Sequence, residues 1–349
     1  MTTKTRYFVI ASLLVLGVGF GTGLVAYYVG FPAGATTRAG GPEELQYIPH
    51  DATVIAYANV QEVMASELRQ KLLHALPMHE SGQREFQDRT GINIETDIDR
   101  IVACLNPDPS NAKVPGQGMV LARGRFDEAK IELLMRDHGA QVEQYKGKRL
   151  VVMTHDADAP TGDVNYHGQS FAAAFIEPGF VGLGSTPLIR SAIDLHQGGN
   201  NPQTGLSSAT GNDELMNLVR SLDGGNAWAV GRFDALTSRA HLPDNVASRL
   251  PAITWFAVSG HINGGLRGMI RAEARDEEAA NNLRDVVRGF MGLAKMQSGS
   301  NPSAQLMMQS LELGGSGKTV ALSFSVPAEV FDVVSGALSN GLPKKNPLK

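Results

Sequence analysis

The sequence has one cysteine, no long basic run and no complete motif for catalysis or nucleotide binding. Because one thiol cannot form an intramolecular disulfide, the fold depends on its hydrophobic core. Cys104 lies in an apolar run, residues 101–105, that is typical of a buried strand, so we expect a buried thiol rather than a reactive or intermolecular one. A formal net charge of −4 without a basic cluster argues against nucleic acid as a partner.

Two short patterns resemble functional motifs, and each lacks a required part. Residues 314–319 (GGSGKT) resemble a phosphate-binding loop, but that motif needs a glycine where Glu312 stands and a helix where residues 320–326 read as a strand. Residues 110–113 (SNAK) match the serine and lysine of penicillin-recognising enzymes, yet they lie between prolines and the partner motifs are missing. We therefore predict no catalytic residue and no cofactor.

The longest uncharged stretch runs from Tyr7 to Thr37, and its apolar part covers residues 8–30. As a helix this part would span roughly 34 Å at about 1.5 Å per residue, which is enough to cross a hydrocarbon core of about 30 Å. Lys4 and Arg6 precede it, so the positive-inside rule places the N-terminus in the cytoplasm. We expect a single-pass anchor in the cytoplasmic membrane, with the body periplasmic or extracellular.

A cleavable signal peptide is the alternative interpretation of this segment. Ala33 and Ala35 provide the A-x-A pattern of a cleavage site. The apolar stretch is much longer than the roughly 7–15 residues of an ordinary signal peptide, however, and this length favours the anchor.

Four glycines of the anchor form two overlapping G-x-x-x-G pairs: Gly17, Gly19, Gly21 and Gly23. Small residues four apart let two membrane helices approach closely, so one hypothesis is a homo-oligomer formed through the anchor. The competing explanation is that glycine is simply common in membrane helices.

The rest of the chain has the composition of a packed body, because 42% of all residues are hydrophobic and 19% are charged. Its β-rich and alternating runs predict strands at 53–60, 98–105, 118–123 and 226–233, and hairpins at 142–153, 171–184, 253–274 and 309–326. Helical periodicity and caps predict helices at 61–76, after Asp127, and at 188–196, 213–222 and 328–338. A further long helix begins at Asp276, with a predicted buried face of Leu283, Val286, Val287, Phe290 and Leu293.

This order of elements repeats, which predicts an α+β fold. An N-terminal transmembrane helix would precede two tandem ferredoxin-like units that have antiparallel sheets and helices packed on one face. The predicted divisions are 1–31 for the cytoplasmic tip and anchor, 32–46 for a linker, 47–198 for the first unit, 199–211 for a second linker, 212–340 for the second unit and 341–349 for a basic tail.

Two local patterns carry a family resemblance. The first strand follows a Pro-x-Asp-Ala/Thr start at residues 49–53 (PHDAT), and a Thr-Gly-Ile-x-x-x-x-Asp-Ile step occupies residues 90–98. With this layout, the chain resembles bacterial membrane-anchored extracytoplasmic proteins of unknown function. Because such families have no known activity, the resemblance implies a location and a fold but no chemistry.

One loop, residues 154–169, concentrates possible metal ligands. They are His155, Asp156, Asp158, Asp163 and His167. Carboxylates and imidazoles could recruit a cation, but the calcium-loop pattern fails at Pro160, so the alternative is an ordinary polar surface loop. Arg123, Arg125 and Arg232, near strand ends, could either hold an anionic ligand or pair with neighbouring carboxylates.

Two functional hypotheses follow. The first is an anchored, non-catalytic protein that binds a partner protein, peptide or envelope component through sheet edges or a cleft between the two units. The alternative is an extracytoplasmic hydrolase whose catalytic groups come together only in the folded chain, because triads assemble from distant positions.

Overall fold

The computed structural model describes residues 41–67, 69, 87–88, 90–106, 117–154, 170–198, 207–222, 224–233, 252–262, 265–297, 305 and 308–327. Its strands are β1 (Val54–Asn59), β2 (Ile98–Asn106), β3 (Gln117–Gly124), β4 (Gln141–Tyr145), β5 (Lys148–Thr154), β6 (Ser170–Glu177), β7 (Phe180–Ser185), β8 (Ala227–Arg232), β9 (Ile253–Ile262), β10 (Gly265–Ala274), β11 (Glu312–Gly314) and β12 (Thr319–Pro327). Its helices are η1 (Glu43–Tyr47), α2 (Val60–Met64), α5 (Ile94–Asp97), α6 (Glu128–Asp137), α7 (Thr186–Gly198), η3 (Ala209–Gly211), α8 (Asp213–Arg220) and α11 (Glu277–Gln297).

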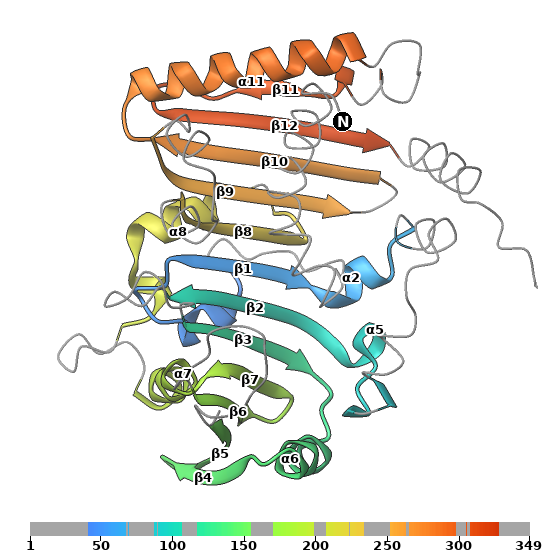
Figure 1. Ribbon diagram of the computed structural model, residues 1–349, viewed down its shortest axis with the longest axis vertical. Helices are drawn as coiled ribbons and strands as arrows, with labels where there is room; N and C mark the ends of the chain where they lie inside the picture. Colours follow the sequence, from blue (N-terminus) through green and yellow to red (C-terminus); the bar gives the residue numbers. More distant parts are fainter. Residues whose placement is uncertain are drawn as a thin grey trace, which may run out of the picture.

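All the described strands belong to one 12-stranded sheet with the order β11-β12-β10-β9-β8-β1-β2-β3-β7-β6-β5-β4 (Figure 1). Each pair of neighbouring strands is antiparallel. Within the described ranges no helix is long and apolar enough to cross a membrane. The predicted anchor, residues 7–31, lies outside these ranges.

The prediction of two tandem ferredoxin-like units with separate sheets was wrong, because β1 hydrogen-bonds to β2 along one edge and to β8 along the other. Tyr57 of β1 lies opposite Trp228 of β8, and their rings stack with centroids 5.6 Å apart. Both strands consist mainly of buried residues. Burial on both faces and pairing on both edges make them central strands of one sheet rather than the boundary between two.

The two halves nevertheless have the same strand order. Reading outward from the centre, β1-β2-β3-β7-β6 in one half corresponds to β8-β9-β10-β12-β11 in the other. In each half the helix that follows the third strand, α6 or α11, precedes the returning hairpin. The first half carries an additional hairpin, β4–β5, at its outer edge.

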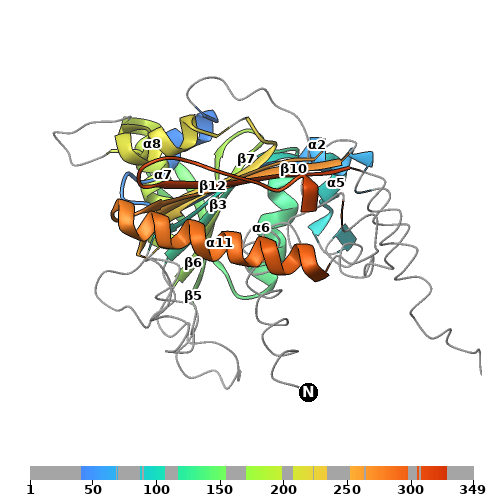
Figure 2. The ribbon, with the colours of Figure 1, turned by 90° about the horizontal axis from the view of Figure 1, so that it is seen from above.

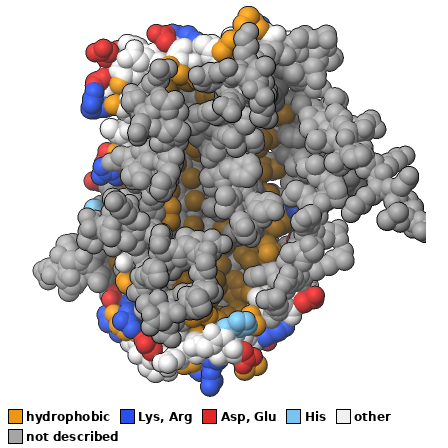
Figure 3. Space-filling view, viewed as in Figure 1, with side chains coloured by type: hydrophobic (Ala, Val, Ile, Leu, Met, Phe, Trp, Pro, Cys, Tyr) orange, Lys and Arg blue, Asp and Glu red, His pale blue; other side chains and the backbone are white. Residues whose placement is uncertain are grey.

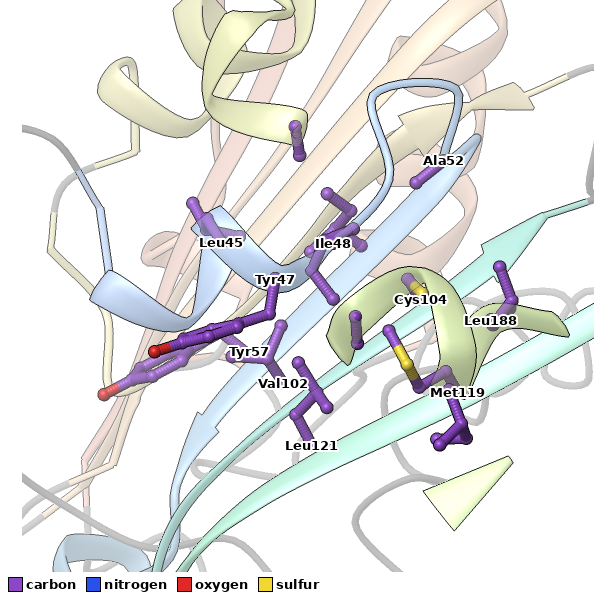
Figure 4. Packing of buried hydrophobic residues seen from close by; sticks show 14 of the residues in the cluster. Leu45, Tyr47, Ile48, Ala52, Tyr57, Val102, Cys104, Met119, Leu121 and Leu188 are labelled. Atoms are coloured by element: carbon purple, nitrogen blue, oxygen red, sulfur yellow. The ribbon is translucent and has the colours of Figure 1, made fainter. Parts of the chain in front are cut away.

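Helices cover both faces of the sheet, which also differs from the predicted single covered face. Figure 2 shows α7 and α8 on one side of the sheet and α6 and α11 on the other. The main core lies beneath η1, α7 and α8, where Leu45, Ile55 and Leu121 are fully buried. Figure 4 shows Tyr47 and Ile48 of the η1 segment packed over Val102 and Leu121 of the sheet.

The opposite face has smaller apolar clusters. Met135 of α6 packs with Val151 and Ala173, and Leu283 of α11 packs with Ala280 and Val320. Figure 3 shows hydrophobic side chains along the middle of the face seen in Figure 1, with charged side chains towards its ends. Alanines make up much of both clusters, and their small side chains each bury little apolar surface.

The predicted hairpins are confirmed: β4–β5, β6–β7, β9–β10 and β11–β12 all pair. Lys146 and Gly147 have positive φ angles of 47° and 75°, as a tight type I′ turn requires. Asp276 begins α11 as predicted, since its carboxylate accepts a hydrogen bond from the Ala279 amide.

The predicted buried face of α11 was wrong at three of its five residues, whereas Leu283 and Val287 are half-buried. Val286, Phe290 and Leu293 are 46%, 53% and 52% exposed. In Figure 1 this helix lies at the β11 end of the sheet, and β11 is only three residues long. The sheet therefore ends beneath the helix, and the sequence pattern cannot show which half of an amphipathic helix overhangs an edge.

Candidate functional site

Most of the predicted site residues lie outside the described residues. These are the loop residues His155, Asp156, Asp158, Asp163 and His167, the anchor residues Gly17, Gly19, Gly21 and Gly23, and the SNAK segment at 110–113. In the part of the chain that the structure describes, no group of three or more His, Cys, Asp or Glu residues is arranged to hold a metal ion. The loop hypothesis therefore stays a prediction.

Cys104 is confirmed as a buried thiol on β2, with an exposed fraction of 2%. Burial raises its pKa to about 12. Since the thiolate is the reactive form, a thiol in this environment is a poor nucleophile.

The GGSGKT segment is a hairpin turn, as expected from its failed motif. β11 ends at Gly314, β12 begins at Thr319, and Gly315 and Gly317 have positive φ angles of 93° and 56°. A strand follows the threonine, so the local geometry differs from the strand–loop–helix of a phosphate-binding loop.

Two of the three arginines singled out from the sequence pair with carboxylates. Arg123 binds Glu44 and Glu177, and the exposed Arg125 contacts Asp97 and donates to the Thr96 carbonyl. Arg232 ends β8 with an exposed side chain, and its backbone amide donates to the Thr53 carbonyl. The structure thus favours pairing over ligand binding for Arg123 and Arg125.

The densest polar arrangement among the described residues surrounds Glu44 of η1. Its carboxylate is 1% exposed, and its Oε1 atom accepts hydrogen bonds from Arg100 Nε at 2.6 Å and from Arg123 Nε at 3.0 Å. Arg100 also contacts Glu43, at 2.6 Å. The Arg123 guanidinium lies 4.4 Å above the centre of the Phe180 ring. Two cations from adjacent strands therefore converge on one buried anion.

A second layer of this arrangement centres on Glu177, at the end of β6. Its Oε1 accepts a hydrogen bond from the Tyr47 hydroxyl at 2.6 Å and lies 3.4 Å from His196 Nδ1 of α7. The hydrogen bond from Tyr47 and the charge of Arg123 hold the pKa of Glu177 below its usual value, against the effect of burial. Burial, followed by the bond to Glu177, raises the pKa of Tyr47.

We name one group the entry cluster, because it joins η1 to β2, β3 and the end of β6: Glu43, Glu44, Tyr47, Arg100, Arg123, Glu177 and His196. Its cations and anions are paired with one another, although Glu44 Oε2 is buried without a hydrogen-bond partner among the described residues. The contacts of His196 are with Glu177 and the Tyr47 ring. Among the described residues, no hydrogen bond joins His196 to a serine or cysteine. The arrangement fits a structural cluster that attaches η1 to the sheet better than it fits a catalytic triad.

A different kind of site lies at the outer edge of the first half. β4 pairs only with β5, and no described strand lies beyond it. The opposite edge is β11, whose three residues offer little backbone. β4 shows no register irregularity, and it contains no proline. Such features protect many edge strands, as do short length and charged side chains, and β4 has the latter two, with five residues and Glu143 at its centre. We call β4 the open edge because no described strand pairs with its outer side.

Side chains of α7 fix β4 from one face. Arg190 contacts Glu143 at 2.7 Å, and Asp194 accepts a hydrogen bond from the Tyr145 hydroxyl at 3.1 Å. On the other face, Val142 packs near Met135 of α6. Side chains of two helices therefore reach β4, one on each face, and the Arg190–Glu143 pair among these contacts is about half exposed.

The backbone groups that this edge presents follow from the hairpin geometry. Tyr145 and Lys148 close a two-residue turn, so they exchange hydrogen bonds, and the pattern alternates along the strand. Val142 and Gln144 accordingly direct their N–H and C=O groups away from β5. An extended peptide could bind to these groups as a further strand.

Sequence reasoning missed both arrangements. Glu43 and Glu44 fell within the predicted linker at 32–46, although the apolar residues Leu45, Tyr47 and Ile48 signalled a packed segment there. The 142–153 hairpin was predicted, but its position as an edge depends on which strands pair, and no local pattern encodes that. No protein-family model, curated protein or solved structure matches this chain. Its function must therefore be argued from its own geometry.

Proposed function

We propose that this chain is a membrane-anchored, extracytoplasmic binding protein that captures an extended segment of a partner by strand addition at β4. The observation that carries the proposal is the open edge of β4, which lies at the end of a continuous sheet and is contacted by side chains of α7 and α6. Anchoring rests on the uncharged segment 7–31 and its preceding basic residues.

Strand addition fits the chemistry of this edge. Main-chain hydrogen bonds supply affinity in this mode, and alternating side-chain contacts supply selectivity. Glu143 and Tyr145 already contact α7, which lowers the cost of ordering them when a partner binds. The predicted cleft between two units has no counterpart in this interpretation, because β1 and β8 join the halves.

The entry cluster supports the anchored part of the proposal. It joins η1, the element nearest the predicted anchor, to β2 and β3 through Glu44. It also reaches His196 of α7, the helix that fixes β4.

The test uses the full chain in lipid nanodiscs and a displayed library of random peptides. The comparison is Gln144→Pro with Gln144→Ala: proline removes the outward N–H, whereas alanine removes the same side chain and keeps that N–H. We expect selected peptides to bind the wild type and Gln144→Ala within about twofold, and Gln144→Pro at least tenfold more weakly, since 1.4 kcal/mol is a factor of about ten.

Two results would count against strand addition: equal binding by both variants, or the failure of any peptide to be selected. Far-ultraviolet circular dichroism of Gln144→Pro checks that the β4–β5 hairpin is intact, because Gln144 faces away from β5 in the backbone pattern. The anchor is tested separately by alkaline extraction of membranes. We expect the full chain to stay with the lipid, and release of the chain would contradict the anchoring.

A further inference from the structure

The C-terminal half of α11 presents an apolar surface that the sheet does not cover. Val286, Phe290, Leu293 and Met296 are 46%, 53%, 52% and 73% exposed. The corresponding helix of the first half, α6, shows one such residue, Leu133 at 59%. An exposed apolar group of this size on one helix is typical of an interaction surface.

Three of these four residues lie on one seam with heptad spacing, whereas Phe290 lies beside the seam, seven positions after Leu283. Asn282, Val286, Gly289, Leu293 and Met296 are separated by four, three, four and three positions, and all are exposed. This is the a/d spacing at which one helix packs against another. Leu283 on the other side of α11 packs towards the sheet, so the helix has one face for its own body and one for a partner.

Gly289 gives this seam a shape. A Cβ atom placed there would meet nothing within 4 Å, so the missing side chain leaves a shallow gap in the middle of the seam. Val286 lies one turn away on the same seam. If two copies of the helix pack in opposite directions, Val286 of each fits against Gly289 of the other, which pairs a bulky residue with a gap.

The charges of α11 favour the same orientation. Its N-terminal half contains Glu277, Glu278 and Asp285 with one arginine, whereas its C-terminal half contains Arg288 and Lys295 and no acidic residue. Asp285 and Arg288 pair with each other within one helix, at 3.0 Å, so the remaining contrast is between Glu277 and Glu278 near one end and Lys295 near the other. In an antiparallel pair with the Val286–Gly289 register, Glu278 lies within about 3 Å of Lys295 of the other copy along the helix axis, at about 1.5 Å per residue. A parallel pair would instead place like charges together.

We infer that the exposed seam of α11 is a self-association surface, at which two copies of this chain pair through antiparallel α11 helices. This surface is separate from the anchor glycines and from β4. The inference does not depend on the proposed strand addition, and either can fail alone.

The test is site-directed crosslinking of the full chain in membranes. Cys104 is the only natural cysteine and is 2% exposed, so an introduced cysteine is the reactive thiol. In the antiparallel register, the Gly289 positions of two copies are offset by about 5 Å along the helix axis and the Asn282 positions by about 17 Å, at about 1.5 Å per residue. A short bismaleimide should link Gly289→Cys chains to each other but not Asn282→Cys chains.

Two further measurements establish the orientation of the helix pair and the rate of crosslinking by random collision. A mixture of Asn282→Cys and Leu293→Cys chains should form a disulfide between copies, because these positions face each other in the antiparallel register. Leu133→Cys, on the exposed part of α6, measures random collision. Adding Leu293→Arg to Gly289→Cys should lower crosslinking at least tenfold and leave the thermal unfolding temperature unchanged, because Leu293 is half exposed.

Three outcomes would overturn the inference. Gly289→Cys could crosslink no faster than Leu133→Cys, which would show collision alone. Asn282→Cys chains could link to each other as efficiently as Gly289→Cys chains, which would show a parallel pair. Gly289→Cys could link only to a different protein, which would make the seam a site for another partner.

Discussion

Arg100 and Glu44 form an ion pair in which Arg100 Nε lies 2.6 Å from Glu44 Oε1, while the carboxylate is 1% exposed. Arg123 binds the same oxygen at 3.0 Å. The residues come from β2, β3 and the short helix η1, which are distant in sequence. One buried carboxylate thus joins the start of the described chain to two neighbouring strands.

Replacing Glu44 with glutamine should destabilise the fold strongly. The substitution keeps the shape of the side chain but leaves two arginines beside a neutral group, and breaking a buried pair in this way costs about 3 kcal/mol. Glu43→Gln is the matched control, because that side chain is 57% exposed and surface pairs contribute about 0–1 kcal/mol. Urea unfolding measures both free energies, and equal losses would contradict a special role for Glu44.

The contact between Tyr47 and Glu177 should make stability depend on pH. The pKa of Glu177 is lowered in the folded state, so its stabilising effect is fully present above the unfolded value of about 4.3 and is lost as the pH falls through the folded pKa. Tyr47→Phe removes the hydrogen bond and should cost about 1.5 kcal/mol at pH 7. Urea unfolding at several pH values should show this difference shrinking below pH 4, and a constant difference would refute the linkage.

Cys104 should resist modification in the native protein. Burial raises its pKa to about 12, and the side chain is almost inaccessible. A chromogenic thiol reagent should therefore react with Cys104 only as fast as the protein unfolds, and denaturant should accelerate this reaction. Rapid labelling of the native chain would show that β2 opens locally or that this thiol has a reactive role.

Gly231→Ala should weaken the junction between the two halves. A Cβ atom at this position of β8 would lie 2.6 Å from the Thr53 carbonyl oxygen, and Thr53 precedes β1. Forcing the strands apart should cost about 1–3 kcal/mol. Gly292→Ala is the control, because its Cβ would lie in open space on a helix and alanine should stabilise it slightly. Thermal unfolding of the pair checks the prediction, and equal unfolding temperatures would contradict it.

Local features of the fold were predictable because short-range chemistry determines them. Lys146 and Gly147 form the turn of the β4–β5 hairpin, and Asp276 caps α11, in both cases as the sequence patterns indicated. Burial of Cys104 also followed from its apolar neighbours. These features depend on backbone conformations and contacts within a few residues.

The candidate sites could not be predicted in the same way. Arg100 lies 56 positions from Glu44, and nothing near either residue in the sequence points to the other. Val286, Phe290 and Leu293 carry the pattern of a buried face, yet they are about half exposed because the sheet ends beneath them. Periodicity records that a helix face is apolar, but it does not record whether the chain's own sheet extends far enough to cover it.

By itself, the sequence determined the strands, turns and helix starts of the body, the single buried thiol, and an uncharged N-terminal segment with the properties of an anchor. The tertiary structure decided that the two similar halves share one sheet, that β4 is an open edge, and that Glu44 is enclosed by two arginines. The physical reason is that strand pairing is a non-local choice. Many strand orders are compatible with the same alternation of apolar and polar residues. Only the packing of both faces of the sheet and the pairing of both edges of each strand select one order.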